Sequence, residues 1–424
     1  PPTPPPDAPT GTPDGSPEEG PASSPDWDDS PGAPAWGAPP NIVKFSGVAS
    51  AGSNSYGLLG TGDTTYTDTD NNPQLVYNGE AIPVAGGDFA CMYTLSFVHC
   101  WGNNSVGQIG QPYSVDTTPS PMRVVGVDQP SRLSAGQQHV CLMEGNTPKC
   151  WGLNNTGQLG DGSTTNSHVP VDVNTSYEYR QLAAGYDHTC GLVSEASSAD
   201  NFLQCWGNNA SGQLGTGSAS IAMTPATLSQ KGWIWVAAGT SMTCAISADV
   251  YCWGANAAGQ LGTGDTNQYN VPTVTVGTAG FTQVSTWGQT TCGIDGQSQM
   301  WCWGDGSLGQ MGNKDYTDTN LTPVSVINPY ATTFVSITSG GGHACGTDVA
   351  WQIYCWGDNT YGQLGTGNSL QTEAELFEAI TGIIGLPSAR NDITLYQLVS
   401  ITPNPKDPPT PPPQPKWQWR KLLL

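Results

Sequence analysis

Charged side chains are scarce in this sequence, and basic ones are the scarcest. Only 11% of the 424 residues are charged, and 12 Lys and Arg stand against 34 Asp and Glu, which gives a formal net charge of -22. Nucleic-acid binding needs clusters of Lys and Arg against the phosphates, so this composition argues against it. Two interpretations of the acidic excess stay open: solubility, and binding of divalent cations or of a cationic partner.

Long apolar segments and catalytic signatures are missing too. No run of about eighteen apolar residues occurs, so the sequence predicts no membrane-spanning segment. It contains no nucleophile elbow, phosphate loop or zinc-protease helix motif. A lyase or hydrolase would show acid, base and nucleophile residues that interrupt any repeat, and none stands out. We therefore expect a protein that is not an enzyme and has no cofactor.

A short motif recurs along most of the chain. CWGLNNTGQLGDG, residues 150–162, has relatives that begin at Cys100, Cys205, Cys252, Cys302 and Cys355, and a degenerate copy, SAGSNSYGLLGTG, begins at Ser50. The copies recur about every fifty residues, a period typical of propellers and solenoids. The motif is therefore scaffold, and we predict one continuous domain.

The twelve cysteines fall into six close couples with none left over: Cys91 with Cys100, Cys141 with Cys150, Cys190 with Cys205, Cys244 with Cys252, Cys292 with Cys302, and Cys345 with Cys355. The residues between partners, as in CLMEGNTPKC, are typical of a β-hairpin. Facing residues on antiparallel strands lie within disulfide range, which predicts one bridge per repeat. Zinc is the alternative, although zinc sites favour closer spacing. Six bridges would indicate an oxidising, extracellular compartment.

Each unit has the same order of elements. An apolar strand ending in Ala-Gly precedes a strand with the first Cys, a hairpin returns through the second Cys and Trp, and the motif loop follows. This order predicts an all-β chain. We expect positive φ at one repeated loop position, which holds Asn54, Asn104, Asn154, Asn209, Asn256, Gly306 and Asn359. We expect a repeated core residue at Leu59, Ile109, Leu159, Leu214, Leu261, Met311 and Leu364.

The pairing of AAGxxHT with CWGxNxxGQLGxG resembles the regulator of chromosome condensation repeat family. The resemblance covers residues 41–402 and implies a seven-bladed β-propeller, here with one intra-blade disulfide in six blades. Residues 395–402, LYQLVSIT, resemble the opening strand of a unit, and the first unit lacks an upstream strand. We therefore expect the two chain ends to form a composite closing blade without a disulfide, and this blade to be the weakest. The cysteines, the acidity and the lack of a basic tail resemble secreted relatives rather than the nuclear exchange factor.

Candidate site residues are few. His139, His188 and His343 share a position that holds Phe89, Met242 or Thr290 in other units, so we predict a structural role. The Asp-rich segments 63–72 and 313–320 could offer oxygens to calcium, but they lack the Gly and distal Glu of a calcium loop, so solvated loops are favoured. Glycosylation sequons begin at Asn103, Asn154, Asn174, Asn209 and Asn320, of which Asn174 and Asn320 are favoured.

Proline-rich tails are predicted at residues 1–40 and 403–424. Both contain PPTPPP, which favours extended polyproline II, and both resemble the hydroxyproline-rich, O-glycosylated stretches of algal and plant extracellular glycoproteins. Buried aromatics dominate interface energetics, which makes the tail tryptophans candidate assembly anchors. They are Trp27, Trp36, Trp417 and Trp419.

These inferences predict a secreted structural or adhesive glycoprotein, a repeating unit of an extracellular filament or surface coat. Its partners would be copies of itself or other extracellular glycoproteins, with glycans attached to Asn and to the tails. The alternative is an extracellular ligand-binding or inhibitor module that captures a protein or carbohydrate on one face. Tyr113, Tyr269 and Tyr316 are candidates for that face.

Overall fold

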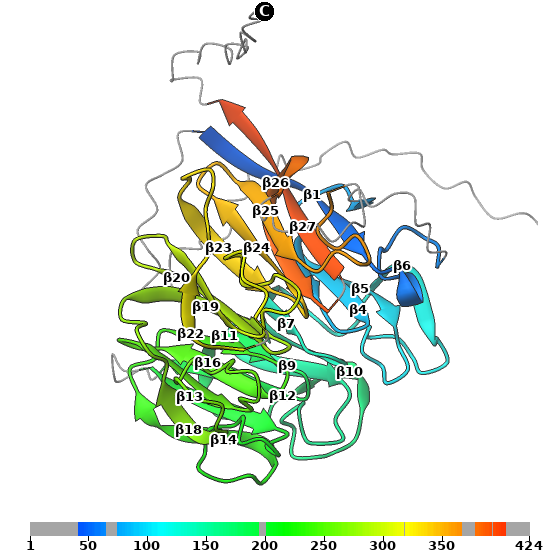
Figure 1. The fold of residues 1–424 in the computed structure, drawn as a ribbon. Coiled ribbons are helices and arrows are strands. Elements are labelled where there is room, and N and C mark those ends of the chain that lie inside the picture. The colour runs from blue at the N-terminus through cyan, green and yellow to red at the C-terminus, as the bar shows by residue number, and fades with distance from the viewer. Residues whose placement is uncertain are drawn as a thin grey trace, which may run out of the picture.

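The protein is a seven-bladed β-propeller, as expected (Figure 1). The structure, a computed structural model, describes residues 41–64, 74–194, 201–317, 319–366, 378–391 and 393–403. These residues contain strands β1 to β27 and one short 3-10 helix, η2 (Ser55–Gly57). Each blade is an antiparallel sheet, and the innermost strands of neighbouring blades contact one another around the propeller axis.

Six blades follow one another along the chain, and in each of them four strands succeed one another from the innermost outward. Blade 1 has β3 (Ile82–Ala85), β4 (Phe89–Tyr93), β5 (Val98–Asn103) and β6 (Thr117–Arg123); blade 2 has β7 (Pro130–Ala135), β8 (His139–Glu144), β9 (Thr147–Gly152) and β10 (Ser167–Asp172). Blade 3 has β11 (Glu178–Ala184), β12 (His188–Ser194), β13 (Phe202–Gly207) and β14 (Ala222–Lys231); blade 4 has β15 (Trp235–Ala238), β16 (Met242–Ile246), β17 (Val250–Gly254) and β18 (Tyr269–Val274). Blade 5 has β19 (Phe281–Trp287), β20 (Thr290–Asp295), β21 (Met300–Gly304) and β22 (Asn320–Ser325); blade 6 has β23 (Phe334–Ser339), β24 (His343–Asp348), β25 (Gln352–Gly357) and the start of β26 (Glu378–Arg390).

The closing blade combines the two ends of the propeller, as predicted. The end of β26, residues 385–390, is its innermost strand, followed outward by β27 (Ile393–Pro403), β1 (Asn41–Gly52) and β2 (Gln74–Tyr77). Figure 1 shows β1 beside β27. The expectation that residues 395–402 open this blade is wrong, because they form its second strand. Leu395 faces Ser50 across β27 and β1, at the two places that cysteines occupy in the other blades.

The core lies between blades. Each of seven buried clusters joins two neighbouring blades, and burial of this apolar surface favours ring closure. The repeated core residue is 0–3% exposed in six units, as predicted, and only partly buried at Leu59.

Each outer strand from blade 1 to blade 5 contains proline. Proline cannot donate a backbone hydrogen bond, so it protects the exposed edge of a blade from pairing with another strand. These residues are Pro119, Pro121, Pro170, Pro225, Pro272 and Pro323.

Candidate functional site

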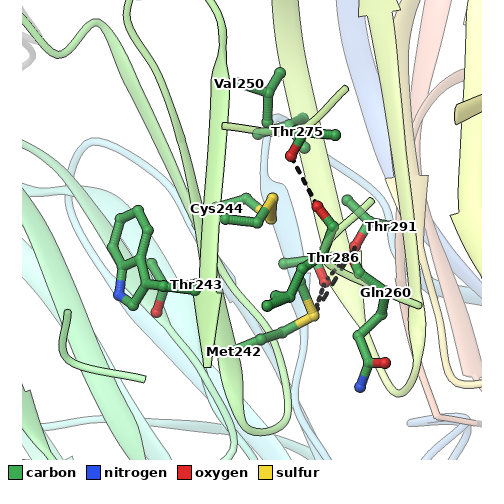
Figure 2. The surroundings of a disulfide bond; sticks show 12 residues. Met242, Thr243, Cys244, Val250, Gln260, Thr275, Thr286 and Thr291 are labelled. Carbon is green, nitrogen blue, oxygen red and sulfur yellow. Dashed lines mark hydrogen bonds between the residues drawn. A yellow bond between two sulfur atoms is a disulfide. The ribbon is translucent and has the colours of Figure 1, made fainter. Parts of the chain in front are cut away.

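All six predicted disulfides are present. Each joins directly facing residues on the second and third strands of a blade, with Cα atoms 4.0–4.1 Å apart. All twelve cysteines are paired, which leaves no thiol for zinc. Figure 2 shows the Cys244–Cys252 bridge among Val250, Thr275 and Thr291. The bridges are fully buried, so they act as internal staples of each hairpin.

The repeated Asn fastens the motif loop through its side chain, and the expectation of positive φ is wrong. Positive φ occurs at none of these residues in the structure, and Asn54 has φ -102. In blade 2, Asn154 Oδ1 accepts from the Leu159 backbone N–H at 2.9 Å, and Nδ2 donates to the Thr165 carbonyl at 3.1 Å. Blade 5 has Gly306 instead, and Asn320 Nδ2 donates nearby to the Thr317 carbonyl at 3.3 Å. The repeated Asn is therefore explained by the hydrogen bonds of its side-chain amide, not by a positive φ that Asn tolerates.

The motif also connects each blade to the next. Trp206 Nε1 donates to the Gln158 carbonyl of the preceding blade at 2.9 Å, and the Thr189 hydroxyl donates to the same oxygen at 3.0 Å. The loop glycine lies against the outer strand of the next blade: a Cβ at Gly157, with φ 83, would lie 2.7 Å from Met223 Cα. The tight turns of the motif therefore set the spacing between blades.

The three repeated histidines are buried inside the scaffold. His188 Nε2 lies 3.0 Å from the Thr243 hydroxyl of the next blade, and that hydroxyl donates to the Gln213 carbonyl. Nε2 must therefore be the donor, which leaves Nδ1 unprotonated and without a partner in the structure. Burial lowers the pKa of His139 and His188 to about 3 and that of His343 to about 4, so all three are neutral at physiological pH.

The sequons differ in access. Asn154 and Asn209 are 0% exposed and use Nδ2 as a hydrogen-bond donor, which blocks that nitrogen in the folded state. Asn103 is also buried, and its Nδ2 donates to Asp88. Asn320 Nδ2 donates to the Gly304 and Thr317 carbonyls, whereas Asn174 is exposed. Of the five sequons, Asn174 is therefore the most accessible in the fold.

Several predicted site residues lie outside the described part of the chain. Both tails do, except Pro403 at the end of β27, and they include Trp27, Trp36, Trp417 and Trp419; so does most of segment 63–72. Asp63 is described, and its carboxylate accepts from Asn54 Nδ2 at 3.1 Å. The described residues contain no group of three or more His, Cys, Asp or Glu arranged to hold a metal.

Two residues interrupt the repeat at the propeller axis. In five blades a glycine follows the innermost strand at the same place: Gly86, Gly136, Gly185, Gly239 and Gly340. A Cβ at Gly136 would lie 2.3 Å from the Gly185 carbonyl oxygen, so this ring is tight. Blade 5 has Trp287 in this place and the closing blade has Arg390. Their side chains stack, with the guanidinium carbon 3.8 Å from the indole ring centroid.

Neighbouring turns complete this group, which we call the axial cluster: Gln137, Trp287, Arg390 and Asn391. Trp287 Nε1 donates to Asn391 Oδ1 at 2.8 Å, and Asn391 Nδ2 donates to Gln137 Oε1 at 3.2 Å. Arg390 Nη2 donates to the Ala184 carbonyl of blade 3 at 3.3 Å. This interruption of the repeat was not predicted, although it does not bring together acid, base and nucleophile residues. The detectable signal was STWGQTTC at 285–292, where four units have Ala-Gly and blade 6 has Ser-Gly.

The end of the propeller that carries this cluster also carries the motif loops and the turns between first and second strands. We call it the turn face. Of seven exposed tyrosines in the described residues, five lie there: Tyr56, Tyr113, Tyr186, Tyr316 and Tyr361. Tyr177 and Tyr330 lie on the opposite face. Of the three predicted candidates, Tyr113 and Tyr316 are each 45% exposed, whereas Tyr269 is partly buried and donates to Asp265.

Fold and loop motif together define a β-propeller built from one repeated unit and stapled blade by blade. The chain belongs to the regulator of chromosome condensation (RCC1) repeat family. That repeat matches residues 150–192, 203–246, 247–294, 297–346 and 352–376, and a second form of it matches 179–213.

Known relatives agree with this assignment. The ultraviolet-B receptor UVR8 of Arabidopsis thaliana is 28% identical over 304 residues, which are 68% of this chain and 66% of the receptor, slightly less than two thirds of its length. Prp20p from Saccharomyces cerevisiae superposes with a TM-score of 0.70 at 18% identity, over 84% of this chain and 92% of Prp20p. Human WBSCR16 has a TM-score of 0.70 at 19% identity, over 83% of this chain and 99% of its own. The two structures show the same fold.

Proposed function

We propose that the protein is an extracellular protein-binding module that presents its turn face to a partner. The observation that carries this proposal is the set of five exposed tyrosines on one end of the disc. Tyrosine offers a large contact area at low entropic cost and is enriched at binding surfaces. The disulfides support an oxidising location, and no helix in the described residues is long and apolar enough to cross a membrane. Prp20p of the same fold binds Gsp1p and histones, which supports protein as the class of ligand.

The turn face is also a rigid platform. Its loops are fastened by the Asn and Trp hydrogen bonds, and buried disulfides close the hairpin below each of six loops. A surface that is ordered before binding loses little conformational entropy when a partner docks. The fold therefore favours recognition over catalysis: the axial cluster supplies no nucleophile, and the three repeated histidines are 0% exposed, out of reach of a substrate.

The test compares the two faces. A turn-face variant, Tyr56→Ser with Tyr361→Ser, and an opposite-face variant, Tyr177→Ser with Tyr330→Ser, are each used to capture extracellular proteins of the source organism. We expect the turn-face variant to lose, at least tenfold, a partner that the unmodified chain and the opposite-face variant retain. Loss of the partner only in the opposite-face variant would reject the turn face as the binding surface.

A second role, as a repeating unit of a filament or coat, is favoured by the PPTPPP motif in both tails. Tails of one unit would dock on a neighbour through their tryptophans, and glycans on the tails would keep the rods extended. Sedimentation velocity of the whole chain beside residues 41–403 tests this role. Large species formed only by the whole chain would support tail-mediated assembly, and monomers in both would reject it.

A further inference from the structure

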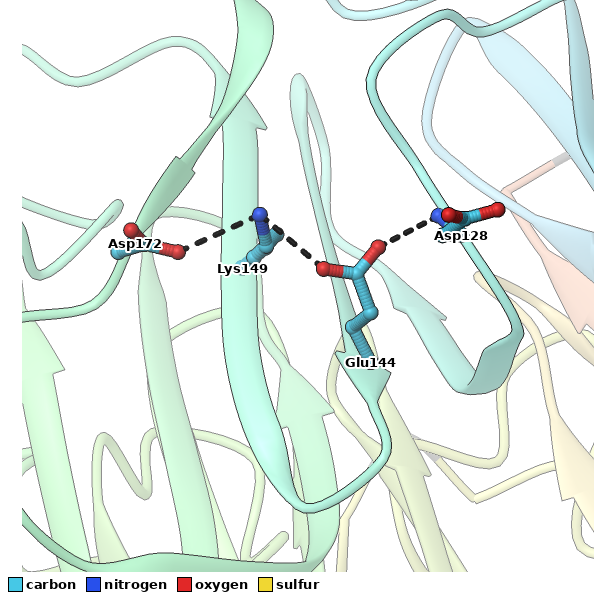
Figure 3. A network of polar contacts seen from close by, with 4 residues as sticks. All are labelled: Asp128, Glu144, Lys149 and Asp172. Carbon is cyan, nitrogen blue, oxygen red and sulfur yellow. Dashed lines mark hydrogen bonds and ion pairs between the residues drawn. The ribbon is translucent and has the colours of Figure 1, made fainter.

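Arg390 is a cation inside the propeller whose charge is not balanced by the described residues. Its side chain contacts the Ala184 carbonyl and the face of Trp287. Lys149 shows the usual arrangement: its Nζ lies 3.2 Å from Glu144 and 3.4 Å from Asp172, and Glu144 accepts from the Asp128 backbone (Figure 3). Desolvation lowers the pKa of Arg390 to about 9, which agrees with the lack of a negative partner.

The Arg390 side chain is held in place, and the residue as a whole is partly exposed. Stacking on the indole fixes the guanidinium plane, and the single bond to Ala184 uses one of its five N–H donors. The residue keeps part of its surface exposed, although it lies among innermost strands. A guanidinium with a fixed plane and unused donors matches the two oxygens of a carboxylate.

The side chains that join Arg390 in the axial cluster are uncharged, and the Asp88 carboxylate accepts from Gln137 Nε2 at 2.9 Å. Asn391 holds Trp287 through its Oδ1 and bonds to the Gly87 carbonyl and Gln137 through its Nδ2. These polar side chains come from blades 2, 5 and the closing blade, so the site is complete only when the ring is closed. Five other blades use glycine at the place of Trp287 and Arg390, so scaffold formation does not require a side chain there.

We propose that the axial cluster binds a carboxylate group through Arg390. The carboxylate comes either from a small free acid or from the chain end of a partner that approaches the turn face. The second source rests on the proposed function; the site itself does not.

The experiment measures thermal unfolding of the full chain in sodium formate against sodium fluoride at equal ionic strength. A ligand that binds the folded state raises the melting temperature in a saturable way. We expect such a rise for formate in the unmodified chain, a weaker one in Arg390→Lys, and none in Arg390→Met. Lys149→Met removes one positive charge at the surface and should keep the full response.

A second arm identifies the source of the carboxylate. A tripeptide with a free C-terminal carboxylate is compared with the same peptide as its amide. A response to the acid but not to the amide, at lower concentration than formate, assigns the site to a partner's chain end; a stronger response to formate assigns it to a small acid. Equal responses to formate and fluoride, or an unchanged formate response in both Arg390 variants, would overturn the proposal.

The two proposals fail separately. The turn-face variant Tyr56→Ser with Tyr361→Ser leaves Arg390 in place and should keep its formate response even if it loses its partner. If the turn-face variant loses its partner but keeps its formate response, the tyrosines bind the partner and the carboxylate site is separate from them. If the unmodified chain binds a partner but shows no formate response, the axial-cluster proposal fails and the proposed function stands.

Discussion

The six disulfide-bonded blades and the closing blade fill equivalent positions with different chemistry. Where the six have a cysteine pair, the closing blade has Ser50 facing Leu395, and Ser50 Oγ donates to the Leu59 carbonyl at 2.7 Å. Where six units have Trp, it has Ala51, and Tyr396 on the adjacent strand donates instead to the Gln363 carbonyl. The six bridges join hairpins that are local in sequence, so none of them holds the ring shut. Closure depends on β1 pairing with β27.

The largest expected effect on stability comes from adding a seventh disulfide to the closing blade. Ser50→Cys with Leu395→Cys places two cysteines at directly facing positions, as in the other blades. The bridge would enclose nearly the whole propeller, and long closed loops gain most in the entropic model, up to about 5 kcal/mol. We expect a bridge to form on oxidative refolding and the melting temperature to rise clearly, as measured by calorimetry.

The single variants Ser50→Cys and Leu395→Cys are the controls, because neither can form this bridge. A bridged double variant that melts at the same temperature as the unmodified chain would show that the closing blade is not the least stable part. Failure to bridge would contradict the β1–β27 register.

Repetition explains why so much of this architecture could be predicted. Seven copies of one motif and six cysteine couples fix the blade, its hairpin and its disulfide, because all of these are local in sequence. The closing blade was predicted from what its two halves lack, but its strand order was not. Residues 385–390 resemble other opening strands only weakly, since Arg390 replaces the expected glycine.

Blades 2, 3 and 6 differ from the other blades because each has a buried histidine at the start of its second strand. The folded-state pKa values of about 3 and 4 lie below the value near 6.5 of an unfolded histidine. Below pH 6.5 the unfolded chain therefore binds more protons than the folded one, and stability falls as pH falls toward the folded pKa. At pH 5 each buried histidine costs about 2 kcal/mol. Desolvation raises the pKa of Asp88 and Asp187, which offsets part of this loss.

Exchanging the residues at this repeated position between blades tests how the buried histidines change the pH dependence of stability. His188→Met copies the residue of blade 4 and should flatten the fall in melting temperature between pH 6.5 and 4. Met242→His should steepen it, because Thr291 provides there the hydroxyl that Thr243 provides to His188 (Figure 2). Equal slopes in all three chains would show that the histidines are not buried in the neutral form.

The odd residue Trp287 was visible in the sequence, but its meeting with the rest of the axial cluster could not be predicted, for a physical reason. Gln137, Trp287 and Arg390 are separated by most of the chain and meet only because the ring brings every innermost strand to one axis. The repeated Asn was misassigned for another reason: its replacement by Gly306 fits positive φ as well as it fits a lost amide. Only the hydrogen bonds, with Asn320 donating beside Gly306, distinguish the two.

The smallest expected effect on stability comes from removing the Tyr396 hydroxyl. Tyr396→Phe keeps the ring that packs with Ala51 and Leu364 but removes the bond to the Gln363 carbonyl, which is 3.4 Å long. A net hydrogen bond is worth about 1 kcal/mol, and a buried carbonyl left without a donor sets the cost near that value. Trp206→Phe in blade 3 is the comparison: it also removes a donor to a Gln carbonyl, at 2.9 Å, but it leaves a cavity as well. We expect denaturant unfolding to show a smaller loss for Tyr396→Phe than for Trp206→Phe. An equal or larger loss would mean that the closing blade depends on this one hydroxyl at least as much as blade 3 depends on the part of the indole that Trp206→Phe removes.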